Sequence, residues 1–242
     1  MRIKLLGVNI DTVGRWEAMR ILSRRLATGR QTAVYTPNPI MVRGAQKNEL
    51  FRALLNRGDL MVADGIGILL GARLAGLPTP PRVAGIDLGE DVLAYAERGG
   101  LKVFLFGGKP GVADRAAEQL KLRFPALEIC GTHHGYISPK ENGALLKRIR
   151  ESRADVVMVC LGSPRQEQWI DENRRALRGV SILMGLGGSL DVWSGDLARA
   201  PRFFSKIGLE WLWRMLRQPR RLTGIFSIIA FLAAALFSRW ER

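Results

Sequence analysis

The sequence predicts an α/β fold with a Rossmann-like, mostly parallel sheet, helices on both faces of that sheet, and a C-terminal helical appendage. Three observations support this prediction. Apolar, β-branched runs alternate with helical patterns, small or polar residues follow five of these runs, and the alternation stops near Ala200. Strands that alternate with crossover helices specify parallel pairing with both sheet faces covered.

Seven runs are typical of strands, and four stretches are typical of helices. The expected strands are Ile3–Ile10, Ala33–Thr36, Leu60–Ala63, Lys102–Phe106, Leu127–Cys130, Val156–Leu161 and Val180–Met184, and the expected helices include Trp16–Ala27, Ala113–Phe124, Gly143–Ser152 and Pro164–Leu177. We therefore assign residues 1–198 to one Rossmann-like domain and residues 199–242 to the appendage.

Composition narrows the possible partners. A hydrophobic content of 47% over 242 residues excludes a disordered chain. The formal charge of +15 indicates a polyanionic partner: nucleic acid, anionic lipid or a phosphorylated substrate. Nine Lys or Arg residues stand against two Glu between Arg199 and Arg242, so much of the excess lies at the C-terminus.

The N-terminus and the cysteines indicate the compartment. The first residues form too short an apolar run for a signal peptide, which predicts a cytoplasmic location. Cys130 and Cys160 have no metal-ligand spacing and each ends an apolar run. We expect both to be buried free thiols in a reducing environment.

The turns after the predicted strands form the candidate site, because doubly wound sheets bind ligands at the carboxyl ends of their strands. Glycine-rich turns follow three of the runs, and they predict an open, nucleotide-sized crevice. The turn at Gly107-Gly108 leads into a helix whose free amides could hold a diphosphate, although a simple tight turn fits these glycines equally well. The five turns are Thr36-Pro37-Asn38, Asp64-Gly65, Gly107-Gly108, Gly162-Ser163-Pro164 and Gly185-Leu186-Gly187-Gly188.

Several of these residues also have a purely structural interpretation. Ser163 to Gln166 reads as a helix capping box, which would make Gln166 a cap partner. Asp64 could cap a turn or a helix, and His133-His134 are more typical of a turn than of a metal site. The chain contains no Asp-x-Asp pair, so we expect no metal. Amides, helix dipoles and arginines would then stabilise a departing diphosphate.

The order of the motifs resembles the WecG/TagA/CpsF family of bacterial glycosyltransferases (glycosyltransferase family 26), over roughly Leu6 to Arg221. The spacing makes the resemblance more specific than any single motif. The motifs are Thr36-Pro37-Asn38, Ala63-Asp64-Gly65-Ile66-Gly67, Arg82-Val83-Ala84-Gly85-Ile86-Asp87, Phe104-Leu105-Phe106-Gly107-Gly108, His134-Gly135-Tyr136, Leu161-Gly162-Ser163-Pro164-Arg165-Gln166-Glu167, Gly185-Leu186-Gly187-Gly188, Arg199-Ala200-Pro201 and Leu209-Glu210-Trp211-Leu212.

The resemblance implies inverting, metal-independent transfer of an N-acetylmannosamine-type sugar from a UDP-sugar to N-acetylglucosamine on a polyprenyl diphosphate, in the synthesis of a cell-surface polysaccharide. No cofactor is implied. Asp64 would be the general base, with Thr36 and Asn38 in the same pocket. The expected substrate-binding residues are Arg82, Gly107, Gly108, Tyr136, Gln166, Asp191, Arg214 and Arg221.

The C-terminal segment points to a membrane. Arg214, Arg217 and Arg221 share one face of a predicted helix that also carries tryptophans, which suits an anionic bilayer surface. The uncharged run Leu222–Ser238 would reach about 25 Å as a helix, against a hydrocarbon core of about 30 Å. We expect a shallowly inserted anchor on the cytoplasmic face of the membrane; a single short span and a buried core helix are the alternatives. Gly224 stands where the family has its last tail arginine.

Two other function classes fit parts of the sequence. A Rossmann-type oxidoreductase would share the fold, but the chain lacks the G-x-G-x-x-G fingerprint. A nucleic-acid-binding protein would explain the charge, but the arginines adjoin an apolar run and no base-reading motif, so we expect no nucleic acid partner. A homo-oligomer is compatible with the sequence.

Overall fold

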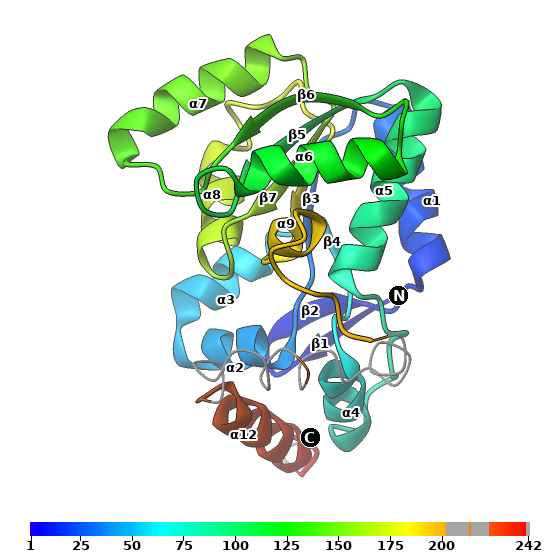
Figure 1. Ribbon diagram of the computed structural model, residues 1–242. Helices are drawn as coiled ribbons and strands as arrows, with labels where there is room; N and C mark the ends of the chain where they lie inside the picture. The colour runs from blue at the N-terminus through cyan, green and yellow to red at the C-terminus, as the bar shows by residue number, and fades with distance from the viewer. Residues whose placement is uncertain (202–212, 214–222, 241–242) are drawn as a thin grey trace. The chain divides into compact units, whose positions relative to one another are not determined.

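The computed structural model describes residues 1–201, 213 and 223–240 (Figure 1). Two compact units divide the chain. Unit 1 comprises Met1–Glu17, Thr36–Gly85 and Arg199–Arg242, and unit 2 comprises Ala18–Tyr35 and Ile86–Ala198. Each unit is therefore built from separated chain segments.

The central element is a six-stranded sheet, in the order β4-β3-β8-β7-β5-β6. The pairs β3–β8, β8–β7, β7–β5 and β5–β6 are parallel. Strands β3, β7 and β8 are buried along their whole length, as expected of parallel strands covered on both faces. The predicted α/β class is confirmed. The strands are β3 (Thr32–Tyr35), β4 (Leu60–Met61), β5 (Lys102–Gly107), β6 (Glu128–His133), β7 (Val156–Cys160) and β8 (Ile182–Gly185).

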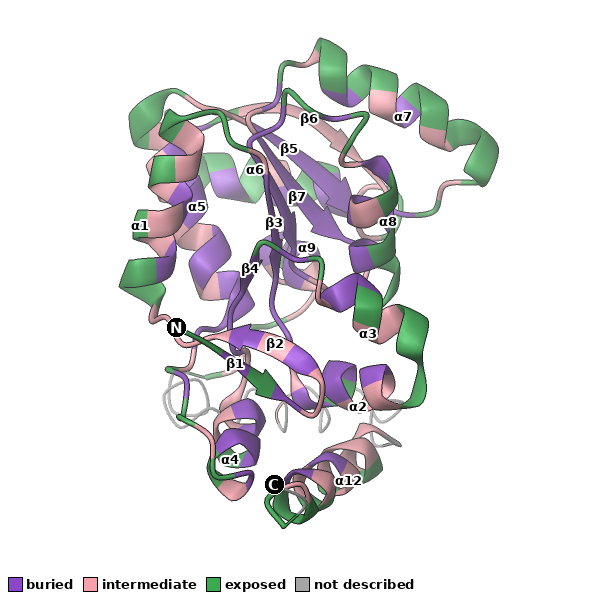
Figure 2. Ribbon diagram, turned by 180° about the vertical axis from the view of Figure 1, so that it is seen from behind, coloured by how far each residue is buried: buried purple, intermediate pink, exposed green. Residues whose placement is uncertain are grey.

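Helices flank the strands of unit 2. Helix α6 (Val112–Arg123) packs on β5 and β6, and α8 (Arg165–Asn173) packs on β3, β7 and β8. The two opposite views place α6 and α8 on different faces of the sheet (Figures 1 and 2), and each helix turns its buried residues toward the strands. The other helices with residues in this unit are α1 (Arg15–Ala27), α5 (Gly85–Gly99), α7 (Pro139–Glu151) and α9 (Ser189–Trp193).

The predicted first strand, Ile3–Ile10, is wrong. The segment forms an antiparallel hairpin of β1 (Arg2–Leu5) and β2 (Val8–Asp11), with Ile3 opposite Ile10. Leu6 and Gly7 make the turn at positive φ, 49° and 84°. One glycine inside an apolar run was the only sequence signal of this turn.

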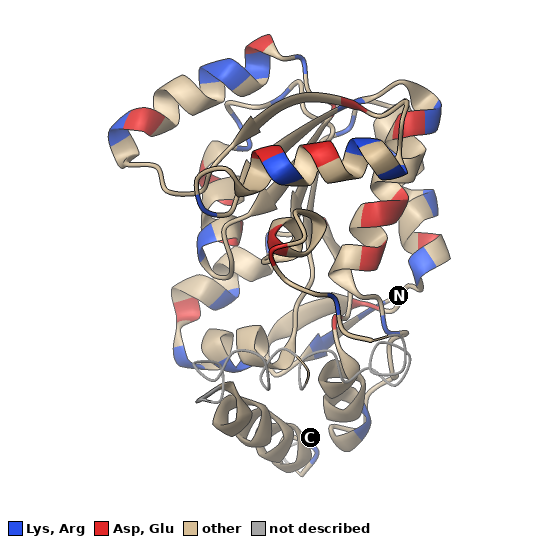
Figure 3. Ribbon diagram, viewed as in Figure 1, with Lys and Arg blue, Asp and Glu red and all other residues tan. Residues whose placement is uncertain are grey.

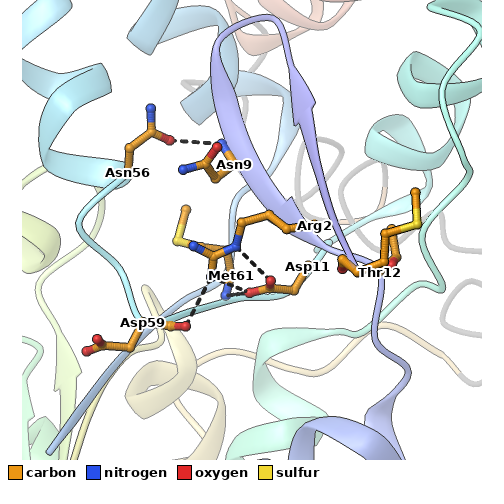
Figure 4. Close-up of polar contacts among 8 residues, drawn as sticks. Arg2, Asn9, Asp11, Thr12, Asn56, Asp59 and Met61 are labelled. Atoms are coloured by element: carbon orange, nitrogen blue, oxygen red, sulfur yellow. Dashed lines mark hydrogen bonds and ion pairs between the residues drawn. The ribbon is translucent and has the colours of Figure 1, made fainter.

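The Asp11 carboxylate ties this hairpin to the neighbouring chain of unit 1 (Figure 4). Its two oxygens accept from Nε and Nη2 of Arg2 at 2.7 and 2.8 Å. Oδ2 also accepts from the backbone N–H of Met61, in β4, at 2.9 Å. The bonds to Asp11 raise the pKa of the Arg2 guanidinium, and the bond from Met61 joins β2 to the strand that leads to Asp64.

The C-terminal helix of unit 1, α12 (Thr223–Phe237), packs against α2 (Pro39–Lys47) and α4 (Ile66–Leu74). Phe231 and Ala235 are fully buried. A Cβ atom on Gly71 of α4 would lie 2.4 Å from the Phe231 ring, so this contact requires glycine there. Helix α3 (Glu49–Leu55) follows α2.

No helix among the described residues is both long and apolar enough to cross a membrane.

Two further predictions concern the tail and the thiols. The predicted basic helix around Arg214–Arg221 lies outside the described residues. Both cysteines are free, as predicted. Cys160 is buried, whereas Cys130 is only half-buried, which corrects the prediction for that residue.

Candidate active site

The predicted residues Thr36, Asn38, Asp64 and Arg82 come together in unit 1, because backbone hydrogen bonds join the three segments that carry them. The N–H of Asp64 donates to the Pro37 carbonyl at 3.0 Å. The N–H of Val83, next to Arg82, donates to the Ala63 carbonyl at 2.9 Å. The turns after β3 and β4 and the loop before α5 are thus held together.

Asn38 occupies the N-cap of α2. Its Oδ1 accepts from the N–H groups of Ile40 and Met41, both at 3.0 Å. An asparagine N-cap satisfies two of the helix's free donors and holds its own side chain rigid. These two bonds use the oxygen, so Nδ2 is the group that can donate to a ligand.

Thr36 is nearly buried, with 6% exposure. Gly85 leaves room for it: a Cβ atom there would lie 3.1 Å from both Oγ1 and Cγ2 of Thr36. The backbone at Gly85 therefore approaches Thr36 so closely that any larger side chain at position 85 would displace Thr36.

Asp64 stands one residue before the N-cap of α4, which is Gly65 at φ 83°. The carboxylate lies half-buried after β4, on a backbone pinned to Pro37. A carboxylate held in this way can accept a proton from a hydroxyl placed against it.

In unit 2, the turn after β5 packs closely on its neighbours. Gly107 and Gly108 have φ of 139° and 68°. A Cβ atom on Gly107 would lie 2.2 Å from the Cys160 carbonyl oxygen, so only glycine fits. Gly108 donates to Cys160 O at 3.2 Å and accepts from the N–H of Gly135 at 2.9 Å. These bonds join the ends of β5, β6 and β7, and they bring the exposed Tyr136 next to the glycine turn.

Gln166 is buried at the start of α8, and its side chain bonds away from the helix end. Its Oε1 accepts from the N–H of Gly187 at 2.7 Å, and its Nε2 donates to Oε1 of Glu167 at 2.7 Å. The N-cap is Pro164, without a side-chain capping hydrogen bond. The predicted capping box is therefore wrong, because the Gln166 amide bridges to a turn 21 residues away.

Asp191 lies in the first turn of α9, just after the Gly187 turn. A Cβ atom on Gly188 would lie 3.2 Å from Oδ2 of Asp191. The Asp191 carbonyl accepts from the N–H of Leu197 at 2.8 Å, which fixes the chain that follows the helix. Its half-buried carboxylate is suited to accept hydrogen bonds from ligand hydroxyls.

The two histidines form a compact pair at the end of β6. The rings of His133 and His134 have centroids 4.7 Å apart, and Nδ1 of His133 lies 2.9 Å from the His134 carbonyl. Nδ1 of His134 is buried without a partner. Among the residues that the structure describes, no three His, Cys, Asp or Glu side chains gather as a metal site.

The predicted residues therefore fall into two groups, one in each unit. Gly107, Gly108, Tyr136, Gln166 and Asp191 share the strand ends of unit 2, while Arg214 and Arg221 lie outside the described residues. Sequence reasoning did not single out Glu167, whose buried carboxyl contacts Gln166. Its only signal in the sequence was an acidic residue beside Gln166 in the same motif.

Comparison with known proteins identifies the family. The model of the glycosyl transferase WecG/TagA/CpsF family matches residues 3–242. An N-acetylglucosaminyldiphosphoundecaprenol N-acetyl-beta-D-mannosaminyltransferase from Bacillus spizizenii is 36% identical over 203 residues, which cover 84% of this chain and 78% of that protein. Neither comparison supports an oxidoreductase or a nucleic-acid-binding protein. The chain belongs to the WecG/TagA/CpsF family of glycosyltransferases.

Proposed function

We propose that this glycosyltransferase moves an N-acetylmannosamine-type sugar from UDP to N-acetylglucosamine on a polyprenyl diphosphate, with inversion and without a metal. The observation that carries the proposal is the 36% identity to a relative named for that acceptor and that sugar. The arrangement of candidate residues in the two units supports it.

Asp64 acts as the general base. As the acceptor hydroxyl oxygen attacks the anomeric carbon, its proton passes to the Asp64 carboxylate, and the bond to UDP breaks with its electron pair on the diphosphate. A single displacement of this kind inverts the anomeric centre and needs no covalent intermediate. The backbone bond from Asp64 to Pro37 supports this role, because it joins the segment that carries the base to the turn that carries Thr36 and Asn38.

The polar neighbours of Asp64 orient the sugars and balance charge. Asn38 Nδ2 and the Thr36 hydroxyl donate to substrate oxygens. Arg82 supplies a permanent charge and forked donors for a phosphate group. The tail arginines Arg214 and Arg221 approach the acceptor diphosphate, while Gly224 cannot contribute as an arginine would.

Unit 2 binds the nucleotide. The turn at positive φ through Gly107 and Gly108 leads to the start of α6, whose free backbone amides can hold a diphosphate. Asp191 accepts from nucleoside hydroxyls, and the exposed Tyr136 offers a ring beside the glycine turn. With no Asp-x-Asp pair in the sequence, these donors stabilise the leaving UDP without a metal.

The protein binds the cytoplasmic face of an anionic membrane through the outer face of α12. This face carries a stripe of exposed large apolar side chains at helical spacing. Helix α12 contains no charged residue (Figure 3), while Arg239 is the second residue after its end. Apolar insertion combined with nearby basic charge is typical of peripheral membrane helices. The stripe consists of Phe226, Ile229, Leu236 and Phe237, and the exposed Trp240 lies just beyond the end of the helix.

A UDP-release assay tests the proposal. The purified chain is incubated with a panel of UDP-sugars and a short-chain N-acetylglucosamine diphospholipid, with and without excess EDTA. We expect UDP release that needs both substrates, favours the N-acetylmannosamine donor and persists in EDTA. Release only after addition of magnesium or manganese would contradict metal independence, and no release with any donor would contradict the proposed function.

A further inference from the structure

Gln166 and Glu167 form a buried link between two turns of unit 2. They are 2% and 0% exposed. The Gln166 amide accepts from the N–H of Gly187 and donates to the Glu167 carboxyl, both at 2.7 Å. The start of α8 is thereby bonded to the turn after β8 through one side-chain amide.

Glu167 determines which way this amide points. If the amide turned over, Nε2 would face the N–H of Gly187 and Oε1 would face the Glu167 oxygen, so two donors and two acceptors would oppose each other. Gly185 permits the close packing, because a Cβ atom there would lie 2.9 Å from Nε2 of Gln166. Removal of the Glu167 acceptor would therefore free the amide and loosen its bond to Gly187.

The surroundings of the buried Glu167 carboxyl do little to stabilise a negative charge. Its Oε2 is buried without a hydrogen-bond partner. Burial raises the pKa of Glu167, and the side-chain hydrogen bonds from Gln166 and Ser163 only partly oppose this effect. The phenol of Tyr35 donates to the Glu167 carbonyl at 3.3 Å, which fixes its backbone. Its Oε1 is the acceptor for the Gln166 amide.

We propose that Glu167 is a positioning residue for sugar transfer: through Gln166 it holds the Gly187 turn, and with it Asp191, in the form that receives the donor nucleotide. This inference rests on the proposed function. Helix α9 begins at Ser189, and the Asp191 carboxylate packs against Gly188, so little chain separates the bonded amide from Asp191. A displaced Gly187 turn would therefore move the Asp191 carboxylate.

Substitutions at Glu167 test the proposal by donor KM, kcat and thermal stability. Glu167→Gln keeps an acceptor oxygen for the Gln166 amide and should retain the wild-type donor KM within about threefold. Glu167→Ala should raise the donor KM about tenfold or more, from loss of one buried hydrogen bond. Glu172→Gln is the matched control, since Glu172 is exposed on the same helix; it should change nothing. Glu167→Asp, one methylene shorter, replaces the alanine variant if that variant fails to fold, and should raise the donor KM as well.

A double-mutant cycle separates positioning from a general loss of stability. If Glu167 acts through Gln166, the Gln166→Ala/Glu167→Ala double variant should have the donor KM of Gln166→Ala alone. Additive effects on KM would overturn the proposal, as would a Glu167→Ala enzyme with the wild-type donor KM, or a Glu167→Gln enzyme as impaired as Glu167→Ala. A wild type that releases no UDP contradicts the proposed function instead, so the two failures are distinguishable.

Discussion

Replacement of two exposed apolar side chains on α12 should release the protein from membranes without disturbing its fold. Phe226 and Ile229 are 75% and 60% exposed, one turn apart on the outer face of the helix. The double variant Phe226→Ser/Ile229→Ser leaves the buried Phe231 and Ala235 in place. It therefore removes contacts with lipid while α12 stays packed on α2 and α4.

The size of the effect follows from these exposures. Full burial of a Phe or Ile side chain contributes about 1.5–3 kcal/mol, which scales to about 1–2 kcal/mol for each of these partly exposed residues. Together they contribute about 3 kcal/mol, or roughly a hundredfold in the partition coefficient at about 1.4 kcal/mol per tenfold. Basic residues near the surface add about 1 kcal/mol each on an anionic bilayer, so the residual binding should decrease with salt.

Vesicle pelleting measures this change directly. The double variant and the wild type are sedimented with vesicles that contain anionic lipid, at low and high salt. Leu50→Ser/Leu122→Ser is the matched control, because these leucines are 83% and 75% exposed but lie on α3 and α6. The control should pellet like the wild type. If the α12 variant pellets equally well, this face does not insert and the membrane assignment of α12 is incorrect.

Three further predictions concern catalysis, packing and thiol chemistry. Asp64→Asn should lower turnover about a hundredfold or more and leave UDP affinity unchanged, as measured by UDP release and calorimetry; near-normal turnover would exclude Asp64 as the base. Phe231→Ala should lower the free energy of unfolding by about 3–5 kcal/mol in urea titration, because it empties the contact with Gly71; a loss below about 1 kcal/mol would contradict that packing. Burial raises the pKa of Cys160 to about 12, so at pH 8 iodoacetamide should label it only after unfolding; burial also raises the pKa of the half-buried Cys130, which should react slowly in the folded protein and faster than Cys160.

The sequence predicted most of the sheet because its inner parallel strands are buried on both faces. Runs such as Val156–Leu161 contain almost only apolar residues, and the observed strand, Val156–Cys160, differs by one residue. The sequence did not predict the hairpin of β1 and β2, because its turn places Leu6 at a positive φ, which leucine rarely adopts. Local pattern reveals burial better than it reveals a turn built on backbone strain.

The candidate site shows a similar division. Thr36, Asn38 and Asp64 could be proposed from strand-end position and motif order, and the structure places them on adjoining turns. The partner of Gln166 could not be predicted, because Gly187 lies 21 residues away and contributes only a backbone N–H. Because this partner is distant in sequence, the local pattern favoured a capping box for Gln166. Bonds between a side chain and distant backbone leave no periodic trace in a sequence.

The discontinuity of unit 1 has a consequence for how the enzyme matures during synthesis. Its first two segments, Met1–Glu17 and Thr36–Gly85, leave the ribosome well before Arg199–Arg242. Domains generally fold as their chain emerges, so unit 2 can complete its strands while the surface around Gly71 still lacks Phe231. The unit that carries Asp64 therefore acquires its full packing only when α12 has been translated. A ribosome stalled before residue 223 would hold a chain with every strand of the sheet, but with the α2 and α4 surface still uncovered.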